Sequence, residues 1–327
     1  MLDRSTVKLI KSVIRKMAFV TIVVGVCALM LVLHLAALDV GRREDWGRQK
    51  AGNYFKMRRN YKGALELLIN YSTRFGDGTV RASPDKIHSV QLWYEAAAMI
   101  KWYISPTEDE YLCKILGNFD NWVFCKDKNL EIKAPCLVYS FGVRNNFQFE
   151  DSFGRLGCDV RSFDPSTNMT DHTHNKTVKF YDLGVGPLNT NVFMPTRRGA
   201  GVNQTDKGDG PWKLRTLKSI MEMLRQQNKI LDVVKIDIKS NLWVVLDNIL
   251  ETGAWRQIRH LLLGFNLYPT HPHKEDYVIF YRTLTKLRER GFVEYFGQTD
   301  DALSTQGDHF TVKGRTSFYN FNLLLGD

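Results

Sequence analysis

The chain has 327 residues, a formal charge of +10 and 44% hydrophobic residues. Its 12% aromatic and 24% charged residues exclude a wholly disordered chain, and only 9 Pro with 24 Gly exclude a collagen-like one. Five Cys are too few for a disulfide-dense miniprotein, and the lack of an internal repeat argues against a solenoid. The sequence therefore predicts a globular body with a sizeable core.

Residues 17–38 contain no Lys, Arg, Asp or Glu. At about 1.5 Å per residue, a helix of this length reaches about 33 Å and spans the hydrocarbon core of a bilayer. The alternative is a cleavable signal peptide, for which Ala36 and Ala37 supply small residues, but the apolar region of such peptides is only about 7–15 residues long. The sequence predicts a cytoplasmic tail at 1–16 and a transmembrane signal anchor at 17–38.

The orientation of this anchor rests on two observations. Five Lys or Arg precede the apolar run and four follow it closely, so the charge rule favours a cytoplasmic N-terminus only slightly. Four Asn-x-Ser/Thr sequons, at Asn70, Asn168, Asn175 and Asn203, all follow the run. We therefore expect a single-pass type II membrane glycoprotein in the Golgi or another secretory-pathway membrane. No basic block with interleaved aromatics is present, so no nucleic-acid partner is expected.

Residues 39–130 are predicted to be a stem with a small helical region. A helical pattern covers 61–70, and Ser83-Pro84-Asp85 has the form of a helix start, with a Ser cap and Pro in the first turn. The helix that it opens is expected to reach about Tyr103. Its aromatic residues are expected to pack against the main domain.

From residue 131 onward, apolar strand patterns alternate with helical ones. This alternation predicts βαβ units around a mostly parallel sheet, and the last two strands, with no helix between them, are expected to be antiparallel. Seven strands with a terminal hairpin are the layout of the class I methyltransferase variant of the doubly wound, Rossmann-like α/β fold. Strands are predicted at 136–141, 159–163, 177–183, 230–238, 258–265, 292–296 and 317–323, and helices at 147–156, 214–224, 242–250 and 277–290.

Ligands of a doubly wound sheet bind beyond the carboxyl ends of the strands, at the topological switch point. Ser140, Gly142 and Asn145 lie at the end of the first predicted strand, Asp164 follows the second and Asp237 follows the fourth. An acid after the second strand is placed to accept both hydroxyls of a ribose, although Asp is also common as a helix cap.

Five segments carry a resemblance to a known family. Residues 138–142 (VYSFG), 147–150 (FQFE) and 157–166 (GCDVRSFDPS) resemble the methyltransferase-like protein 24 type, which is related to the FkbM methyltransferases. Residues 212–217 (WKLRTL) and 234–238 (VKIDI) are similar to later segments of that family. The resemblance covers about residues 110–325 and implies binding of S-adenosylmethionine (SAM).

The resemblance also implies roles for single residues. Gly142 would lie against the methionine part of SAM, Asp164 would hold the ribose and Asp182 would lie near the adenine. The acceptor it implies is a hydroxyl or carboxyl of a glycan or another secretory-pathway substrate. Of the acids that follow the fourth strand, Asp237 matches the family and is the candidate catalytic residue.

The chain departs from the family at several positions near this predicted site. After Asp237 the family usually reads I-E-G-x-E-W, whereas this chain has Lys239, Ser240 and Leu242 in place of the two acids and the glycine. After the fifth strand the family tends to read L-E-I-H, whereas this chain has Gly264 and Asn266. Because methyl transfer usually needs a base to accept a proton, a catalytically inactive binding or scaffold protein is the alternative.

Other chemistries have weaker support in the sequence. His172 with His174, and His271 with His273, alternate along extended segments, but zinc needs three or four ligands in a defined geometry, so no metal site is expected. Type II topology is also common among Golgi glycosyltransferases, but the chain has no Asp-x-Asp motif. It also has no Gly-x-Ser-x-Gly elbow and no P-loop.

The pairing of the cysteines indicates whether the domain folds in an oxidising compartment. Cys27 lies in the predicted anchor, and the other four, Cys113, Cys125, Cys136 and Cys158, allow three pairings. Cys136 and Cys158 stand at the starts of two strands expected to be parallel neighbours about 4.8 Å apart, which is within reach of a disulfide. The sequence therefore predicts Cys136–Cys158 and, by elimination, Cys113–Cys125, with four free thiols as the alternative.

Overall fold

The computed structural model describes residues 61–104, 113–128, 130–195, 210–267, 273–300 and 312–323, together with Met30. The chain divides into two compact units, Met1–Lys50 and Ala51–Asp327. The predicted anchor apart from Met30, and also Cys27, Asn203 and His271, lie outside the described residues. Within the ranges just given, no helix is both long enough and apolar enough to cross a membrane.

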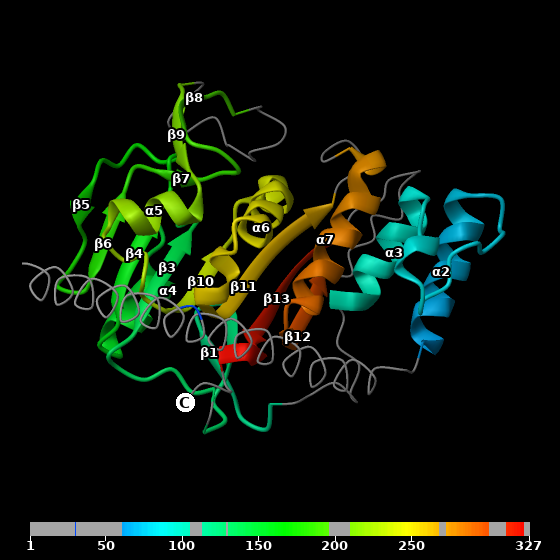
Figure 1. Cartoon of the computed structure of the whole chain (residues 1–327), viewed down its shortest axis with the longest axis horizontal. Helices are drawn as coiled ribbons and strands as arrows, with labels where there is room; N and C mark the ends of the chain where they lie inside the picture. Colours follow the sequence, from blue (N-terminus) through cyan, green and yellow to red (C-terminus); the bar gives the residue numbers. More distant parts are fainter. Residues whose placement is uncertain are drawn as a thin grey trace, which may run out of the picture. The chain divides into compact units, whose positions relative to one another are not determined.

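An eight-stranded sheet is the centre of the second unit (Figure 1). Neighbouring strands are parallel from β11 through β10, β3 and β4 to β6, while β13 and the short β5 are antiparallel to their neighbours. The unit is thus a mixed α/β structure with a large, mostly parallel sheet, as predicted. In spatial order the strands are β12 (Phe292–Asp300), β13 (Val312–Asn320), β11 (Ile258–Leu267), β10 (Leu231–Ile236), β3 (Leu137–Phe141), β4 (Asp159–Phe163), β6 (Val178–Tyr181) and β5 (His172–Thr173).

The strand order places the switch point between β3 and β10. From β3 the chain adds β4 and β6 on one side, then returns to add β10 and β11 on the other. At such a reversal the loops that leave the two central strands diverge and open a crevice at their carboxyl ends. All five side chains of β3 (LVYSF) are buried, as expected for a central strand that is covered on both faces.

Helices cover one face of the sheet, and one helix with a hairpin covers the other. On the first face the apolar side chains of β3 and β10 pack with α3 (Trp93–Ile104), α5 (Leu217–Met223), α6 (Leu242–Glu251) and α7 (Tyr277–Glu289). On the second face, Phe149 and Phe153 of α4 (Gln148–Arg155) pack with Phe124 of the hairpin β1 (Leu116–Phe119) and β2 (Trp122–Cys125). Short 3₁₀ turns lie at Ile87–Ser89, Lys239–Asn241, Ala254–Gln257, Lys274–Asp276 and Phe321–Leu323.

A small second sheet follows β6, and the sequence did not predict it. Its strands are β7 (Gly184–Val185), β9 (Trp212–Arg215) and β8 (Thr190–Phe193), with β9 in the middle. The predicted helix at 214–224 is therefore wrong at its start, since Leu214 belongs to β9. The helix α5 begins at Leu217, and the Oγ1 of Thr216 caps it by accepting from the N–H of Ser219 at 3.1 Å.

The predicted helix start at Ser83 is also wrong. Ser83 forms an isolated β-bridge with Lys86, and α3 begins only at Trp93. The buried carboxylate of Glu95 explains this start, because it accepts from the N–H groups of Gln91 and Leu92, both at 3.2 Å, and of Ala82 at 3.1 Å. The preceding helix, α2 (Lys62–Phe75), runs five residues beyond the predicted 61–70 segment and packs on α3.

A buried ion pair attaches the helical region to the sheet. The guanidinium of Arg288 on α7 donates to Glu294 Oε2 of β12 at 2.8 Å and to the backbone oxygen of Tyr103 on α3 at 2.6 Å. Both charged side chains are almost fully buried. The described part of the predicted stem region therefore packs as part of the body, because α3 contacts α7, β12 and β13 directly.

The two predicted disulfides are both present. Cys136 and Cys158 lie beside the first residues of β3 and β4, with their Cα atoms 4.5 Å apart. Cys113 and Cys125 are joined at a Cα separation of 5.7 Å and close the loop in front of the domain. Of the three possible pairings of these four cysteines, the predicted one is confirmed.

Candidate functional site

A pocket opens where the switch-point rule predicts it, at the carboxyl ends of β3, β4 and β10. The small sheet β7–β9–β8 and the start of α6 supply the rest of its wall, so the pocket lies between the main sheet and this second sheet. The lining residues are Phe141, Gly142, Arg144, Phe163–Ser166, Gly184–Pro187, Phe193, Trp212, Leu214, Asp237–Lys239, Asn241, Val244 and Val245.

Gly142 lies where the loop after β3 passes very close to the backbone of the loop after β10. Its φ of +87° lies in the left-handed region, and a Cβ at this position would lie 2.2 Å from the backbone oxygen of Asp237. The N–H of Asp237 in turn donates to the oxygen of Phe141 at 3.0 Å. Glycine is therefore required here, and the two loops are fixed against each other at the pocket edge.

Asp164 accepts hydrogen bonds from two loops at the edge of the same pocket. Its Oδ2 accepts from the N–H of Arg144 at 2.9 Å, and its Oδ1 accepts from Ser166 N at 2.9 Å and Ser166 Oγ at 2.6 Å. The carboxylate thus joins the loop after β3 to the loop after β4. A carboxylate has about four acceptor positions, so one remains for a further donor. Its predicted role at a ribose stays a prediction.

Ser140 lies on the other face of β3 from the pocket. Its Oγ donates to Glu150 of α4 and accepts from Lys235 Nζ at 3.2 Å. The Lys235 ammonium also lies 3.5 Å from Glu150 Oε1 and 3.4 Å from the oxygen of Gly142. These buried groups pack against the Gly142 loop on the side away from the pocket. Ser140 therefore contacts Glu150 and Lys235 and is not a lining residue of the pocket.

Asp237 borders the pocket beside Gly264 of β11. A Cβ on residue 264 would lie 2.6 Å from Asp237 Oδ1. The carboxylate therefore occupies the space in which a side chain at position 264 would begin. Lys239, two residues further on, also lines the pocket and holds a left-handed φ of +57°, which is uncommon for a residue with a side chain.

Asn145 and Asp182, the remaining predicted site residues, are not among the lining residues. Asn145 is exposed at a left-handed φ of +61° in the loop after β3. Asp182 follows β6, and its N–H donates to Asp171 Oδ1 at 2.7 Å. The structure therefore brings Gly142, Asp164 and Asp237 together at one pocket and leaves these two beside it.

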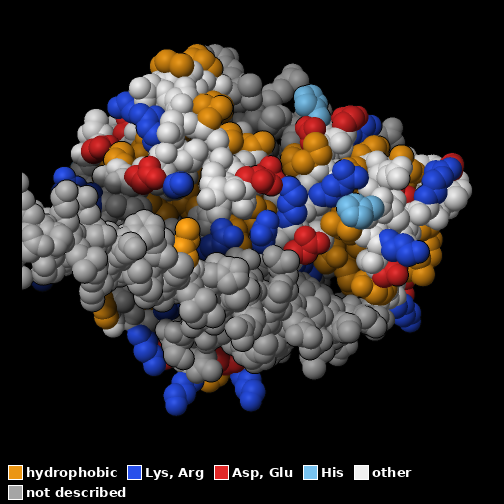
Figure 2. Space-filling model, viewed as in Figure 1, with side chains coloured by type: hydrophobic (Ala, Val, Ile, Leu, Met, Phe, Trp, Pro, Cys, Tyr) orange, Lys and Arg blue, Asp and Glu red, His pale blue; other side chains and the backbone are white. Residues whose placement is uncertain are grey.

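Sequence reasoning missed the wall made by β7, β8 and β9. A usable signal was present, because Trp212 and Leu214 are buried while Lys213 between them is exposed, which is the two-residue period of a strand. Next to the pocket this sheet carries exposed hydrophobic side chains, which Figure 2 shows gathered over β8. They are Leu188, Val192 and Met194.

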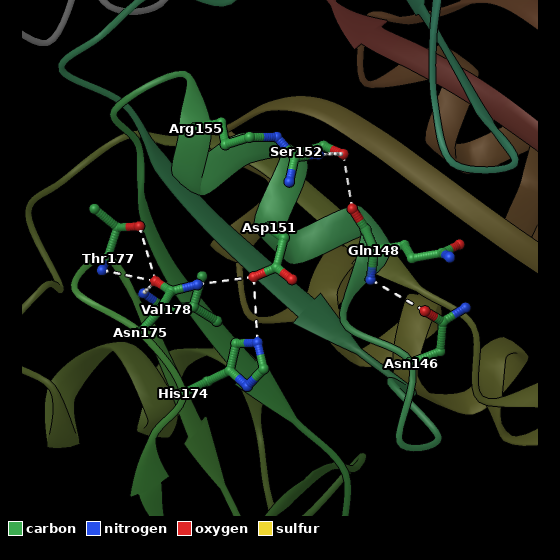
Figure 3. Close-up of polar contacts among 9 residues, drawn as sticks. All are labelled: Asn146, Gln148, Asp151, Ser152, Arg155, His174, Asn175, Thr177 and Val178. Atoms are coloured by element: carbon green, nitrogen blue, oxygen red, sulfur yellow. Dashed lines mark hydrogen bonds and ion pairs between the residues drawn. The ribbon is translucent and has the colours of Figure 1, made fainter.

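His172 and His174, the alternating pair for which no metal site was expected, lie at the β5 edge of the main sheet. His174 stacks on Phe147 with ring centroids 4.0 Å apart, and its Nε2 lies 3.2 Å from Asp151 Oδ1 (Figure 3). Among the residues that the structure describes, the one group of three close metal-ligand side chains is Cys113, Cys125 and Asp127. The two sulfurs of that group form a disulfide, so they are not metal ligands.

Comparison with known proteins bears on this geometry. The model of a family described as "Methyltransferase domain" matches residues 68–308, which include every strand of the main sheet except β13. The chain belongs to this methyltransferase family. Its match begins within α2, before the predicted domain boundary at 130, in agreement with the packing of α2 on α3 and of α3 on β12 and β13.

Individual relatives of this methyltransferase family member are distant. The human "Probable methyltransferase-like protein 24" is 23% identical over 153 residues, which are 45% of this chain and 38% of the human protein. The Rattus norvegicus protein of the same name is 23% identical over 180 residues, 52% of this chain and 46% of its own length. The matches thus span less than half the length of these relatives. No solved structure matches the chain.

Proposed function

We propose that this chain is a SAM-dependent methyltransferase whose cofactor binds in the pocket at the ends of β3, β4 and β10. The observation that carries the proposal is the position of Gly142, Asp164 and Asp237 at one pocket on the switch point. The match to the methyltransferase family supports it independently, since that match rests on sequence and not on the pocket.

The residues of the pocket fit a nucleoside cofactor. The Gly142 turn lines the pocket and brings the loop after β3 against the backbone of Asp237, and Asp164 Oδ2 has one loop donor and can accept a second. The wall is mostly apolar, with Phe163, Val185 and Leu214 available to contact a flat base. Such a wall with a few placed polar groups is the usual form of a cofactor site.

Each residue would have a separate task. When bound, SAM supplies an activated methyl group on a sulfonium. The Gly142 turn would hold the methionine end, Asp164 would accept from the ribose hydroxyls, and the Asp237 carboxylate would take the proton of a hydroxyl acceptor. Lys235 and Glu150 beneath the loop keep the Gly142 backbone in place, because Lys235 donates to the oxygen of Gly142.

We further propose that the protein is anchored by residues 17–38 in the Golgi or another secretory-pathway membrane, with this domain in the lumen. Both disulfides support an oxidising compartment, since such bonds are rare in the cytosol. The acceptor would then be a glycan or another molecule of that pathway.

The test is calorimetric titration of the full chain in detergent with SAM and with S-adenosylhomocysteine, the product form of the cofactor. We expect saturable binding of both, with a dissociation constant below 1 mM, and clearly weaker binding in Asp164→Ala, at a carboxylate that lines the pocket. The control is Asp151→Ala, which also removes a carboxylate that accepts a hydrogen bond but does not line the pocket. Absence of binding at millimolar concentrations of both compounds contradicts the proposal.

One observation favours a second candidate, a catalytically inactive member that binds the cofactor. The family tends to carry an acid where this chain has Gly264, and the Asp237 side chain occupies the space beside that glycine. This chain therefore lacks one acid that could serve as a base. Detection of cofactor binding without methyl transfer to any fraction of secretory-pathway glycans would favour this candidate.

A further inference from the structure

The amino-end edge of the main sheet, opposite the candidate pocket, is strongly basic. The five segments that lead into β3, β4, β10, β11 and β12 contain seven Lys or Arg and two acids. These segments are 126–136, 156–158, 224–230, 252–257 and 290–291. Their cations are all exposed, and they are Lys126, Lys128, Lys133, Arg225, Lys229, Arg256 and Arg290.

The pocket edge has the opposite balance of charge. The segments that leave β3, β4, β6 and β10, at 142–147, 164–171, 182–183 and 237–241, contain two cations and four acids. At the amino-end edge, the last turns of α4, α5, α6 and α7 add three cations and three acids, so the excess of positive charge there is unchanged. The charge of the domain is therefore polarised along the strands.

Contacts between the segments join them into one surface. Gln257 Nε2 donates to the backbone oxygen of Lys229 at 3.0 Å, which connects the segments before β11 and β10. The guanidinium groups of Arg256 and Arg290 lie over the ring of Trp255, at 4.7 and 5.6 Å from its centroid, which adds the segment before β12. The segments before β3 and β4 are joined by the second disulfide. Figure 2 shows Lys and Arg side chains at the lower edge of the view, over the loop that follows the β1–β2 hairpin.

Both acids of these segments have partners of their own. Asp127 accepts from two backbone N–H groups of the preceding loop, and Glu131 lies 3.0 Å from Lys133 Nζ. Beside them at the start of β10, Asp232 is paired with Arg259 at 2.9 Å. The segments before β10, β11 and β12 contain no acid, so nothing within them offsets their positive charge.

Large aliphatic side chains are exposed among these cations. Leu156 is 42% exposed in the segment before β4, and Ile230 is 36% exposed in the segment before β10. Ile115, at 58% exposure, is held beside Lys126, whose N–H donates to its oxygen at 2.7 Å. Cations interleaved with aliphatic side chains suit a bilayer surface, where the charges contact lipid phosphates and the apolar groups enter the headgroup region. A sulfated polysaccharide offers the anions but no apolar phase.

A bilayer is also within reach of this edge. On the proposed anchoring, residues 39–60 connect the anchor to the domain, and they can extend to at most about 75 Å. Contact between the tethered domain and its own membrane is then intramolecular, so weak interactions are sufficient for docking.

We propose that the amino-end edge of the main sheet docks on the phospholipid headgroups of the membrane that holds the anchor. This inference rests on the proposed anchoring and does not depend on SAM binding. The candidate pocket, at the opposite ends of the same strands, would then face away from the bilayer and take its acceptor from the lumen.

The experiment measures amide hydrogen exchange of the full chain in lipid nanodiscs. One set of discs is made of phosphatidylcholine, and the other also contains anionic phosphatidylglycerol. We expect segments 224–230 and 252–257 to exchange at least about 3-fold more slowly in the anionic discs, while the pocket segment 182–187 exchanges equally in both.

Matched variants separate this surface from a general effect of charge. Arg225→Glu/Lys229→Glu should remove the difference between the two kinds of disc. Lys213→Glu/Lys218→Glu, which makes the same charge change at exposed cations of β9 and α5, should retain it. Leu156→Ser should reduce protection of segment 156–158, whereas Leu188→Ser, at an exposed leucine beside the pocket, should not.

The possible failures are distinguishable. Equal exchange in both kinds of disc, by a chain that has entered them, would overturn this inference alone. Protection of the same segments by heparin in detergent, with no change in discs, would identify a sulfated polysaccharide as the partner and also overturn it. A chain that does not enter the discs would contradict the anchoring and this inference with it. Failure to bind S-adenosylhomocysteine would bear only on the proposed cofactor site.

Discussion

The carboxylate of Asp237 stands beside Gly264, so that a Cβ on residue 264 would lie only 2.6 Å from Asp237 Oδ1. Asp237 directly follows β10, and Gly264 lies within the adjacent parallel strand β11. The residue types at the two positions are therefore not independent, because a larger residue at 264 requires Asp237 to move.

The first prediction concerns this pair. Gly264→Ala should lower the free energy of unfolding by about 1–3 kcal/mol, because overpacking forces the Asp237 side chain out of its place. The double variant Asp237→Ala/Gly264→Ala should recover part of that loss, since the atom in the way is gone. Denaturant unfolding of the two single variants and the double variant measures the coupling. Strictly additive losses would show that the two side-chain positions do not compete.

The second prediction concerns Asp164, which joins two loops through bonds to Arg144 and Ser166. Asp164→Ala should weaken SAM binding by about 1.5–3 kcal/mol and also lower the free energy of unfolding by about 1–3 kcal/mol, because loop donors lose their acceptor. Calorimetric titration and thermal unfolding measure the two effects separately.

Ser166→Ala is the control, since it removes only the Oγ bond to Asp164 and should have a small effect on both quantities. A loss of stability in Asp164→Ala with unaltered SAM affinity would mean that Asp164 is a loop cap and nothing more.

The third prediction concerns acid stability. His260 of β11 is fully buried, its Nε2 donates to the oxygen of Leu130 at 3.0 Å, and burial lowers its pKa from 6.5 to about 4. Between these two pH values the unfolded chain binds a proton that the folded chain does not. The stability that depends on neutral His260 is therefore present above pH 6.5 and falls as the pH drops toward 4, by on the order of 3 kcal/mol.

Unfolding measured between pH 7 and 4 tests this dependence. His260→Gln should have a flatter profile over that range, whereas His88→Gln, at an exposed histidine, should keep the wild-type slope. A wild-type slope in His260→Gln would mean that other groups cause the acid instability.

The fourth prediction concerns the disulfide between Cys136 and Cys158, which are 22 residues apart in sequence. Replacing both with Ala should lower the free energy of unfolding by about 2–4 kcal/mol, since the crosslink limits the unfolded chain. Peptide mapping without reductant should recover a Cys136–Cys158 link and a Cys113–Cys125 link from protein made in animal cells. Free thiols at all four positions would argue against a lumenal domain.

The fifth prediction concerns glycosylation at Asn175, an exposed sequon residue. Its Oδ1 accepts from the N–H groups of Thr177 and Val178, and its Nδ2 donates to Asp151 (Figure 3). An amide nitrogen carries two hydrogens, so a glycan can replace one and leave the bond to Asp151 intact. If the domain is lumenal, Asn175→Gln should lose one glycan on a gel, in protein from animal cells.

Asn70→Gln is the comparison, because Asn70 is also exposed but lies inside the helix α2, whereas Asn175 lies in a loop. An Asn175→Gln band identical to that of the wild type, before and after treatment with a glycosidase that removes N-glycans, would contradict this prediction.

The main sheet was predictable because each central strand is a short apolar run followed by a turn signal. Residues 137–141 and 231–236 have this form, and both strands are buried along almost their whole length. The small sheet was not predictable in the same way, because β7 has two residues and β8 is mostly exposed. Leu214 has a helical spacing with Leu217 and Met221, so the pattern assigned it to the helix. In the structure Leu214 belongs to β9 and lines the pocket.

The candidate site was predictable to the extent that strand ends define it. Gly142, Asp164 and Asp237 follow three strands that end at one edge, so the topology alone brings them together. Ser140 does not join them, because alternate residues of a strand point to opposite faces and Phe141 takes the pocket side. Trp212 could not be assigned, since nothing local indicates that β9 returns to the pocket.

The attachment of α3 through Arg288 and Glu294 makes residues 61–104 part of the folded domain. Arg288 also donates to the oxygen of Tyr103, so removal of α3 would uncover a charged pair that is now buried. A protease cut or an alternative transcript that lost residues 61–104 would not merely shorten a flexible spacer. It would remove one side of the domain's core, and the expected result is a misfolded chain rather than a shorter folded domain.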